Sequence, residues 1–222
     1  MRFEDFPARS PLVARHEGAR LVLHGAATAP VVACYPRECA GDGVIDLSNA
    51  NRWGLRGADA AARLEAWGFS LPERPNHALS QPDGSQVVRL SRLEYLLLGG
   101  LDEGAARIAE FAARIGALDA AYPLPRLDSH AWLFLHGEAR ASVMAKLCGV
   151  DMSSKAFSTG AVAQTVVARI NAIVVNLPLA GAEGFSLLCD RAAADYLWDV
   201  LLDALEEFGG GAQGLSALRP VQ

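Results

Sequence analysis

The segment Asp128-Ser-His130 contains the three residue types of a serine hydrolase, in which an acid orients a histidine and the histidine activates a hydroxyl group. These residues are adjacent in the sequence. Neighbouring side chains on an extended segment point to opposite faces, so they cannot form the relay that a nucleophile needs. We therefore interpret the segment as the polar entry to a strand, with His130 held by a hydrogen bond.

Cysteine and histidine side chains could bind a metal or form a redox pair. The four cysteines, at positions 34, 39, 148 and 189, include no Cys-x-x-Cys pair, and none of the five histidines stands at zinc-ligand spacing beside them. Pro36, between Cys34 and Cys39, favours a simple turn over a redox pair. We expect reduced thiols, no metal site and no redox role.

Acid-base catalysis needs carboxylates that are shielded from water. Four aspartates lie along the last predicted helix, but they alternate with its apolar positions and therefore lie on its solvated side: Asp190, Asp195, Asp199 and Asp203. The motifs of nucleophile elbows, zinc proteases, P-loops and dinucleotide sites are missing from the sequence. The run Gly209-Gly-Gly211 follows a helix, whereas phosphate binds where a helix begins. We assign no catalytic, cofactor-binding or metal-binding residue.

Composition narrows the class of protein. The chain has 222 residues, of which 51% are hydrophobic and 20% charged, as in folded globular proteins. Its net charge of −5, without a cluster of basic residues, argues against a nucleic-acid partner. The acidic start is unlike a secretory signal, and polar residues interrupt the apolar stretch Ala161–Leu179, which argues against a membrane span. We expect a cytoplasmic protein with no membrane partner.

The chain from Gly43 onward repeats one order of elements, and such repetition determines the fold before any single motif does. Each pass contains a strand, a glycine turn, a helix ended by a left-handed glycine, further strands and a closing helix. The first pass comprises Arg52–Gly57, Ala58–Trp67 with Gly68, Val87–Leu90 and Tyr95–Leu98, and the second comprises Trp132–Gly137, Glu138–Cys148 with Gly149, Val174–Leu177 and Phe185–Leu188.

Each closing helix has an apolar face suited to packing on a sheet. The predicted N-caps are Asp102 and Asp190, and the predicted ends are Gly116 and Gly209. The faces consist of Ala105, Ile108, Ala109, Ala112 and Ile115 in the first helix, and of Leu197, Val200, Leu201, Ala204, Leu205 and Phe208 in the second. Turns are expected at Pro82-Asp-Gly84 and Ser158-Thr-Gly160, and the four tryptophans, Trp53, Trp67, Trp132 and Trp198, are interpreted as core residues over interface anchors.

The sequence predicts an α+β fold with two pseudo-symmetric lobes, each an antiparallel sheet backed by helices. We divide the chain into an N-terminal arm at 1–45 that packs on the body, a first lobe at 46–125, a second lobe at 126–209 and a flexible tail at 210–222. Residues 46–209 can also be counted as one domain. The arm is expected to contain two short strands, Ala19–His24 and Pro30–Tyr35.

Two groups of segments resemble known families. The segment Gly43-Val-Ile-Asp-Leu-Ser48, followed by Trp53-Gly-Leu-Arg-Gly57-Ala-Asp59, resembles the opening of the folate-binding aminomethyltransferase family. The second half is similar to the gamma subunit of heterotetrameric sarcosine oxidases and related N-methyl amino acid dehydrogenases. Its matching segments are Asp128-Ser-His-Ala-Trp132, Leu147-Cys-Gly-Val-Asp151, Ala163-Gln-Thr165, Ala168-Arg-Ile-Asn-Ala-Ile173 and Asp195-Tyr-Leu-Trp198.

This resemblance implies an aminomethyltransferase-like fold and the role of gamma subunit in a flavoenzyme that oxidatively demethylates sarcosine or a related N-methyl amino acid, with one-carbon transfer to tetrahydrofolate. Its partners would be alpha, beta and delta subunits. FAD, FMN, NAD, zinc and tetrahydrofolate would lie in those partners, and none in this chain. The gamma subunit supplies no known catalytic residue, so its role would be structural, through binding of the alpha subunit. The N-methyl substrate and the electron acceptor stay open.

The alternative is a stand-alone folate-dependent aminomethyltransferase-like one-carbon protein. It would need a carboxylate in a deep pocket, yet no acidic residue occurs from Ser85 through Arg89, where the folate-binding relatives place theirs, and the chain stops without their C-terminal barrel. A repair-type folate protein would carry a K-G-C-Y-x-G-Q segment, and Lys146-Leu-Cys-Gly149 lacks its Tyr and Gln. A broad apolar face favours the subunit, and a deep pocket with a buried acid favours the transferase.

Overall fold

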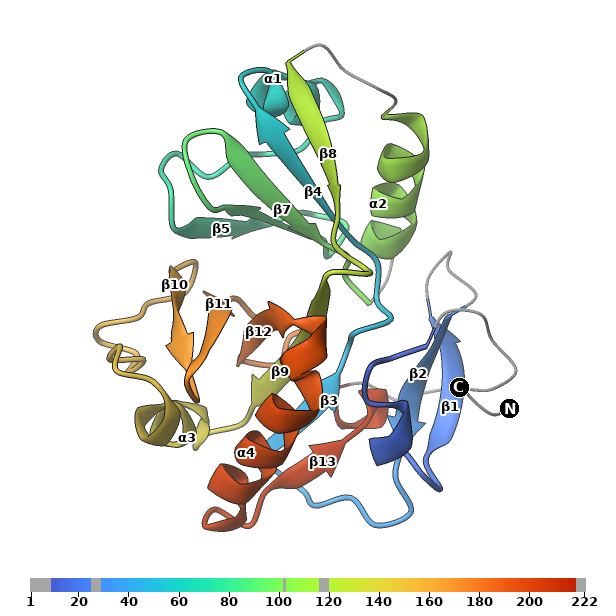
Figure 1. The fold of residues 1–222 in the computed structure, drawn as a ribbon, viewed down its shortest axis with the longest axis vertical. Coiled ribbons are helices and arrows are strands. Elements are labelled where there is room, and N and C mark those ends of the chain that lie inside the picture. Colours follow the sequence, from blue (N-terminus) through green and yellow to red (C-terminus); the bar gives the residue numbers. More distant parts are fainter. Residues whose placement is uncertain (1–8, 25–28, 102, 116–119, 219–222) are drawn as a thin grey trace.

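The computed structural model describes residues 9–24, 29–101, 103–115 and 120–218. Two sheets form the body, and Figure 1 shows one above the other with helices beside each. The first sheet contains β4 (Arg52–Gly57), β5 (His77–Ser80), β6 (Gln86–Arg89), β7 (Glu94–Leu98) and β8 (Ala121–Pro125), with helices α1 (Ala60–Ala66) and α2 (Glu103–Arg114). The second contains β3 (Gly43–Asp46), β9 (His130–His136), β10 (Val162–Val167), β11 (Ile170–Asn176), β12 (Gly184–Asp190) and β13 (Gly211–Gln213), with α3 (Arg140–Leu147) and α4 (Ala194–Glu206).

The internal repeat is present in the strand order. The sheets read β5-β6-β7-β4-β8 and β10-β11-β12-β9-β3-β13, so the four strands of each pass take equivalent places. All pairs in these sheets are antiparallel except β13 with β3. The α+β prediction is therefore confirmed.

The two lobes exchange one strand each. Strand β3 leads into β4 of the first lobe but pairs with β9 of the second, and β8 leads into β9 but pairs with β4. Strand β3 begins at Gly43, within the predicted arm, yet it lies inside the second sheet. Because β3 and β8 each lead directly into one sheet but pair in the other, the two lobes are joined at this crossover by strands that the chain places in the opposite sheet.

Three apolar clusters hold these layers together, and the largest driving force for each is burial of apolar surface. The cluster between the two sheets includes Val88, Leu96 and Leu98 from the first and Trp132, Phe134 and Val175 from the second. A second cluster joins the outer face of the second sheet to α3 and α4, and a third joins the first sheet to α1 and α2. The molecule is thus a four-layer arrangement of helices, sheet, sheet and helices.

The predicted helix faces are largely correct. In α4, Leu197, Leu201 and Leu205 are fully buried, as expected from their spacing. In α2, Ile108 is buried with Phe111, which the predicted face omitted. Of the tryptophans, Trp132 and Trp198 are core residues, whereas Trp53 and Trp67 are only partly buried.

Local turn signals are mostly confirmed. The backbone at Gly68, Gly84, Gly160 and Gly209 has positive φ. Asp190, predicted to cap the closing helix, instead caps the short 3-10 turn Arg191–Ala193 that leads into α4, where it accepts a hydrogen bond from the N–H of Ala192 at 2.8 Å. The left-handed conformation predicted for Gly149 is wrong, because Cys148 leaves α3 in an extended conformation and forms a bridge with Val167. The cap Asp102 and the end Gly116 lie outside the described residues.

The described segments nearest the two ends of the chain pack on the body. Strands β1 (Arg20–His24) and β2 (Ala29–Cys34), the two strands expected in the arm, pair antiparallel, and Val31 packs in the cluster between the sheets. The prediction of a flexible tail at 210–222 is wrong for its described part, because β13 pairs with β3 and Leu215 is buried. Glu38 accepts hydrogen bonds from the Gly214 N–H and the Ser216 hydroxyl, which secures this segment. No helix among the described residues is long and apolar enough to cross a bilayer.

A tight turn joins β10 and β11 without a glycine. Ala168 and Arg169 have φ of 48° and 68°, a left-handed conformation that costs a residue with a side chain about 1 kcal/mol. We predict that Arg169→Gly raises the free energy of unfolding by about 0.5–1 kcal/mol, because glycine adopts this conformation without strain. Urea unfolding monitored by tryptophan fluorescence measures the change, and a loss of stability would contradict the strained turn. Lys155→Gly, at an exposed loop position, is the control.

Candidate functional site

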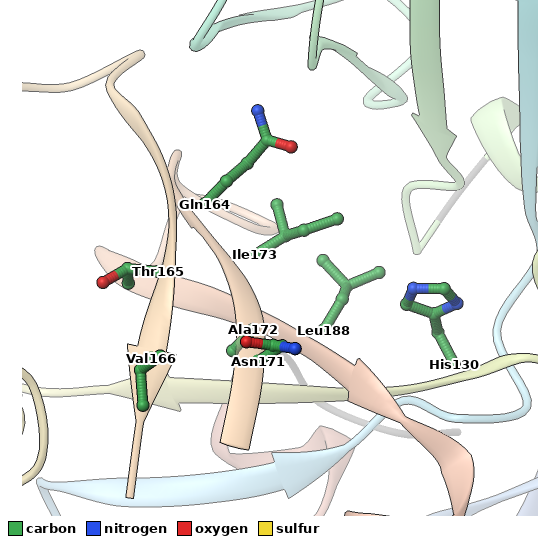
Figure 2. A pocket seen from close by; sticks show the side chains of 8 residues that line it. All are labelled: His130, Gln164, Thr165, Val166, Asn171, Ala172, Ile173 and Leu188. Carbon is green, nitrogen blue, oxygen red and sulfur yellow. The ribbon is translucent and has the colours of Figure 1, made fainter. Parts of the chain in front are cut away.

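A pocket of about 370 Å3 opens on the inner face of the second sheet, at the end where β9 begins (Figure 2). It is lined by His130, Gln164, Thr165, Val166, Asn171, Ala172, Ile173 and Leu188. The register pairs Gln164 with Ile173 and Ile173 with Leu188, which places these three side chains on one face of the sheet. Gln164 also reaches the first lobe, where its amide donates to the Leu90 carbonyl at 2.7 Å.

The pocket has an apolar centre and a neutral polar rim. Ile173 and Leu188 lie between Gln164 and His130 in Figure 2, and Val166 is 48% exposed at the edge. Burial, followed by the charges of Arg126 and Arg52, lowers the pKa of His130 to about 4. The imidazole is therefore uncharged near neutral pH, and the lining includes no carboxylate.

The Asp128-Ser-His130 segment is a strand entry, as interpreted, but one part of that interpretation is wrong. Ser129 belongs to the turn before β9 and not to an extended segment, so its hydroxyl lies 2.8 Å from His130 Nδ1. The same hydroxyl approaches the Pro125 carbonyl at 3.4 Å. The contact confirms that His130 is hydrogen-bonded, and the low pKa makes the ring a weak base.

A buried polar network that the sequence analysis missed lies under the arm. Asp46 Oδ2 is 2.9 Å from His16 Nε2, and His16 Nδ1 is 2.7 Å from the Tyr35 hydroxyl. Asp46 also accepts hydrogen bonds from the Ser10 hydroxyl and, at 2.8 Å, from the Ser48 N–H. The only signal in the sequence was Asp46 itself, inside the segment that carries the aminomethyltransferase resemblance.

The electrostatics of this network identify its role. Burial alone would raise the pKa of Asp46, but the hydrogen bond and charge of His16, with those of Ser10 and Ser48, lower it below its ordinary value. Burial, then the charges of Asp46 and Glu38, raises the pKa of Tyr35. An ionised Asp46 can only accept, so in the neutral ring His16 Nε2 carries the proton and Nδ1 accepts from Tyr35. Since the His16 and Asp46 side chains are 0% and 3% exposed, the network anchors the arm to β3 away from solvent.

Arg52 is the largest buried cation, and it connects the two halves of the chain. Its guanidinium donates to the carbonyls of Ser48, Ala50, Arg126, Leu127 and His130. The first two precede β4, and the other three precede or begin β9. Burial lowers the pKa of Arg52 to about 10, so the side chain keeps its charge near neutral pH. Arg52 thus holds the crossover between the lobes.

The aspartates of α4 and the four cysteines lie outside this pocket and this network. Asp195 and Asp199 are on the solvated side of α4, as predicted, and both bind Arg15 of the arm, at 3.0 and 2.7 Å. Burial, then the charge of Asp190, raises the pKa of the Cys189 thiol to about 11. The four cysteines are free, and within the described ranges no three histidine, cysteine or acidic side chains are grouped for a metal.

A stand-alone transferase would need a buried carboxylate that lines a deep pocket. Asp46 is a buried acid, but its oxygens accept hydrogen bonds from groups of this chain, and it is not among the residues that line the 370 Å3 pocket. The strand that follows the Gly84 turn contributes Val87 and Val88 to apolar clusters. Val88 packs in the apolar cluster between the two sheets, and this strand, Gln86–Arg89, contains no acidic residue.

Comparisons with known proteins agree with the fold. The chain is 28% identical over 130 residues to an aminomethyltransferase of Saccharopolyspora erythraea, covering 59% of this chain but only 35% of that protein's length. It is 27% identical over 148 residues to the sarcosine oxidase subunit gamma of Corynebacterium sp. strain P-1, covering 67% of this chain and 70% of that subunit. The resemblance inferred from the sequence is thus confirmed.

Solved structures show the same architecture. A chain of the heterotetrameric sarcosine oxidase from Corynebacterium sp. U-96, in complex with pyrrole 2-carboxylate, superposes with a TM-score of 0.66 at 21% identity, over 91% of this chain and 96% of that one. The glycine cleavage system aminomethyltransferase T from Bartonella henselae superposes with a TM-score of 0.65 at 18% identity, over 94% of this chain and 60% of that one. The family model of the GCVT N-terminal domain matches residues 86–221, more than half of the sequence, and the chain therefore belongs to the GCVT N-terminal domain family.

Proposed function

We propose that this chain is the gamma-type subunit of a heterotetrameric flavoenzyme that oxidatively demethylates sarcosine or a related N-methyl amino acid. The observation that carries the proposal is the similarity to a gamma subunit, 27% identical over 67% of this chain and 70% of that subunit, together with the superposition on a sarcosine oxidase chain over 91% of this chain. Its role is structural, through contact with an alpha subunit.

The surface around the 370 Å3 pocket supports this role. Its apolar centre, formed by Ile173 and Leu188, is bordered by Val166 and by neutral polar groups, a composition typical of protein interfaces. Arg52 and the interlocked strands make the face rigid, which limits the entropy lost on association. We propose this face as the contact with the alpha subunit. FAD, FMN, NAD, zinc and tetrahydrofolate are proposed to lie in the alpha, beta and delta partners.

A second candidate is a stand-alone one-carbon transferase that binds tetrahydrofolate. The sequence similarity and the superposition with aminomethyltransferases favour it, since both extend through most of this chain. A native pull-down of the tagged protein from its own cells separates the candidates. Large partners with a flavin spectrum and N-methyl amino acid oxidation would support the subunit, whereas a colourless monomer that binds tetrahydrofolate in calorimetry would support the transferase.

We predict that Val166→Arg weakens binding to the co-purified partners at least tenfold, because it places a charge on an exposed apolar position within the proposed contact. Its side chain is 48% exposed, so the variant should fold normally. Tyr196→Arg is the matched control, since Tyr196 is also 48% exposed but lies on α4, on the outer side of the sheet. Surface-immobilised variants give the dissociation constants. Equal weakening by both variants, or by neither, would place the contact elsewhere.

A further inference from the structure

A second pocket, of about 460 Å3, lies on the outer face of the second sheet, where α3 begins and where β11 and β12 meet. Its wall includes Arg140, Asn176 and Phe185. Phe185 packs in the outer apolar cluster, whereas Leu188 of the first pocket packs between the sheets. The two pockets are therefore on opposite faces of one sheet, and the proposed subunit contact leaves the second pocket open.

Arg140 gives this pocket a cation that is incompletely paired. Its Nη1 donates to the Gly137 carbonyl at 2.8 Å, and its Nη2 is 3.6 Å from Glu183 Oε2, beyond hydrogen-bond distance. Its Nε donates to no group that the structure describes. Arg140 is also the first residue of α3, whose N-terminus has no side-chain cap. The Ala139 N–H before this residue already donates to Asp42 Oδ1 at 2.6 Å, so the guanidinium is the group suited to a ligand carboxylate.

Asn176 gives the pocket an acceptor that is also unpaired. The residue is only 6% exposed, and its side-chain N–H donates to the Phe157 carbonyl at 2.6 Å. Its Oδ1 accepts from no group within the described part of the chain. Its backbone N–H donates to the Ala161 carbonyl, and its backbone carbonyl accepts from the Gly160 N–H. The side-chain Oδ1 is therefore the polar atom of Asn176 that a ligand could bind. A buried acceptor of this kind is stabilised by a ligand N–H or a water molecule.

The rest of the lining combines apolar and acidic groups. Phe157 and Phe185 meet edge to face with ring centroids 5.8 Å apart, and Met152 is buried beside them. Glu138 and Glu183 are exposed at the rim. The lining has one guanidinium and two carboxylates, so its net charge is negative, which disfavours phosphates and other dianions. A zwitterion satisfies both signs of charge.

We propose that this pocket binds a free α-amino acid with an apolar side chain. The carboxylate binds the Arg140 guanidinium, the ammonium group lies toward Glu183 and Asn176, and the side chain packs on Met152 and the phenylalanine rings. The binding is non-covalent and reversible. The proposal does not depend on the assignment of the chain as a gamma-type subunit, since it uses the lining of this chain alone.

Calorimetry on the full chain tests the ligand chemistry with three probes. L-methionine is expected to bind with 1:1 stoichiometry, N-acetyl-L-methionine lacks the ammonium group, and L-methionine amide lacks the carboxylate. Each of the latter two should bind at least tenfold more weakly, because each loses a charge-assisted hydrogen bond. Absence of binding by L-methionine, or equal binding by all three, would overturn the proposal.

Variants locate the ligand in the pocket. Arg140→Gln should weaken L-methionine binding about tenfold or more, and Glu183→Gln, at an exposed position, should weaken it without affecting folding. Arg114→Gln is the matched control, because Arg114 is exposed and pairs only with Glu110 within α2. The Met152 methyl resonance should shift on titration in the parent chain. Binding that survives both pocket variants, or an unshifted Met152 signal, would assign the ligand to another place.

Discussion

Asp46→Ala is expected to lower the free energy of unfolding by about 3–5 kcal/mol, because it removes the acceptor shared by three buried donors. The variant leaves His16 Nε2, the Ser10 hydroxyl and the Ser48 N–H without their acceptor in a place that water does not reach. The arm loses its main polar anchor to β3. Since small domains are stable by about 5–15 kcal/mol, the change is large enough to measure in urea.

Asp203→Ala is the control for this loss, because Asp203 is on the exposed side of α4. It should change stability by less than about 0.5 kcal/mol. The pH dependence gives a second readout. The folded state lowers the pKa of Asp46, so the stabilisation is complete above the ordinary carboxyl pKa of about 3.9 and is lost as the pH falls below it. The difference between parent and variant should therefore shrink in acid. A difference that stays constant down to pH 3 would contradict the lowered pKa of Asp46.

Arg52→Ala is expected to destabilise the fold by a similar amount, about 3–5 kcal/mol, since it removes a buried side chain and leaves five carbonyls with fewer donors. These carbonyls belong to the segments on either side of the crossover, around Ala50 and Leu127. Both segments precede a strand that pairs with the other half of the chain. The variant should therefore weaken the two lobes together, as one unfolding transition with a lower midpoint.

Arg52→Lys separates charge from geometry. An ammonium group keeps the charge but has three donors at one point, so it cannot reach carbonyls on both sides of the crossover, and about half of the loss should remain. Arg56→Ala is the control on the same strand, because Arg56 is 65% exposed and only 3.8 Å from Glu94. It should cost less than about 1 kcal/mol. Full stability of the lysine variant would show that the planar guanidinium is not needed.

The predicted elements whose signals are local agree with the structure. The Asp-Gly hairpin, the Gly209 end and the apolar face of α4 depend on residues a few positions apart. The errors came where distant contacts decided. Gly149 does not end α3 in the left-handed conformation, because Cys148 joins Val167 across the sheet, and the glycine-rich tail is ordered because β3 offers it a free edge.

The candidate site depended more strongly on tertiary structure. Nothing in the spacing of Ser10, His16, Tyr35 and Asp46 indicates that they meet, because they come from the arm and from β3. The pocket lined by Arg140 and Asn176 likewise joins the start of a helix to the end of a strand. The contact between Ser129 and His130 was excluded on the assumption of an extended backbone, and a turn reversed that conclusion.

The sequence by itself determined the repeated order of strand, helix, strands and helix, together with the resemblance to the aminomethyltransferase and sarcosine oxidase gamma families. Periodicity, caps and turn glycines act over one or two turns of chain, so they can be read locally. Only the tertiary structure decided the pairing of β3 with β9 and of β8 with β4. It also decided the ion pair of Arg15 with Asp195, 180 positions apart in the sequence, and the partners of Asp46 and Arg52. Such contacts depend on which distant segments become neighbours, and no local preference specifies that.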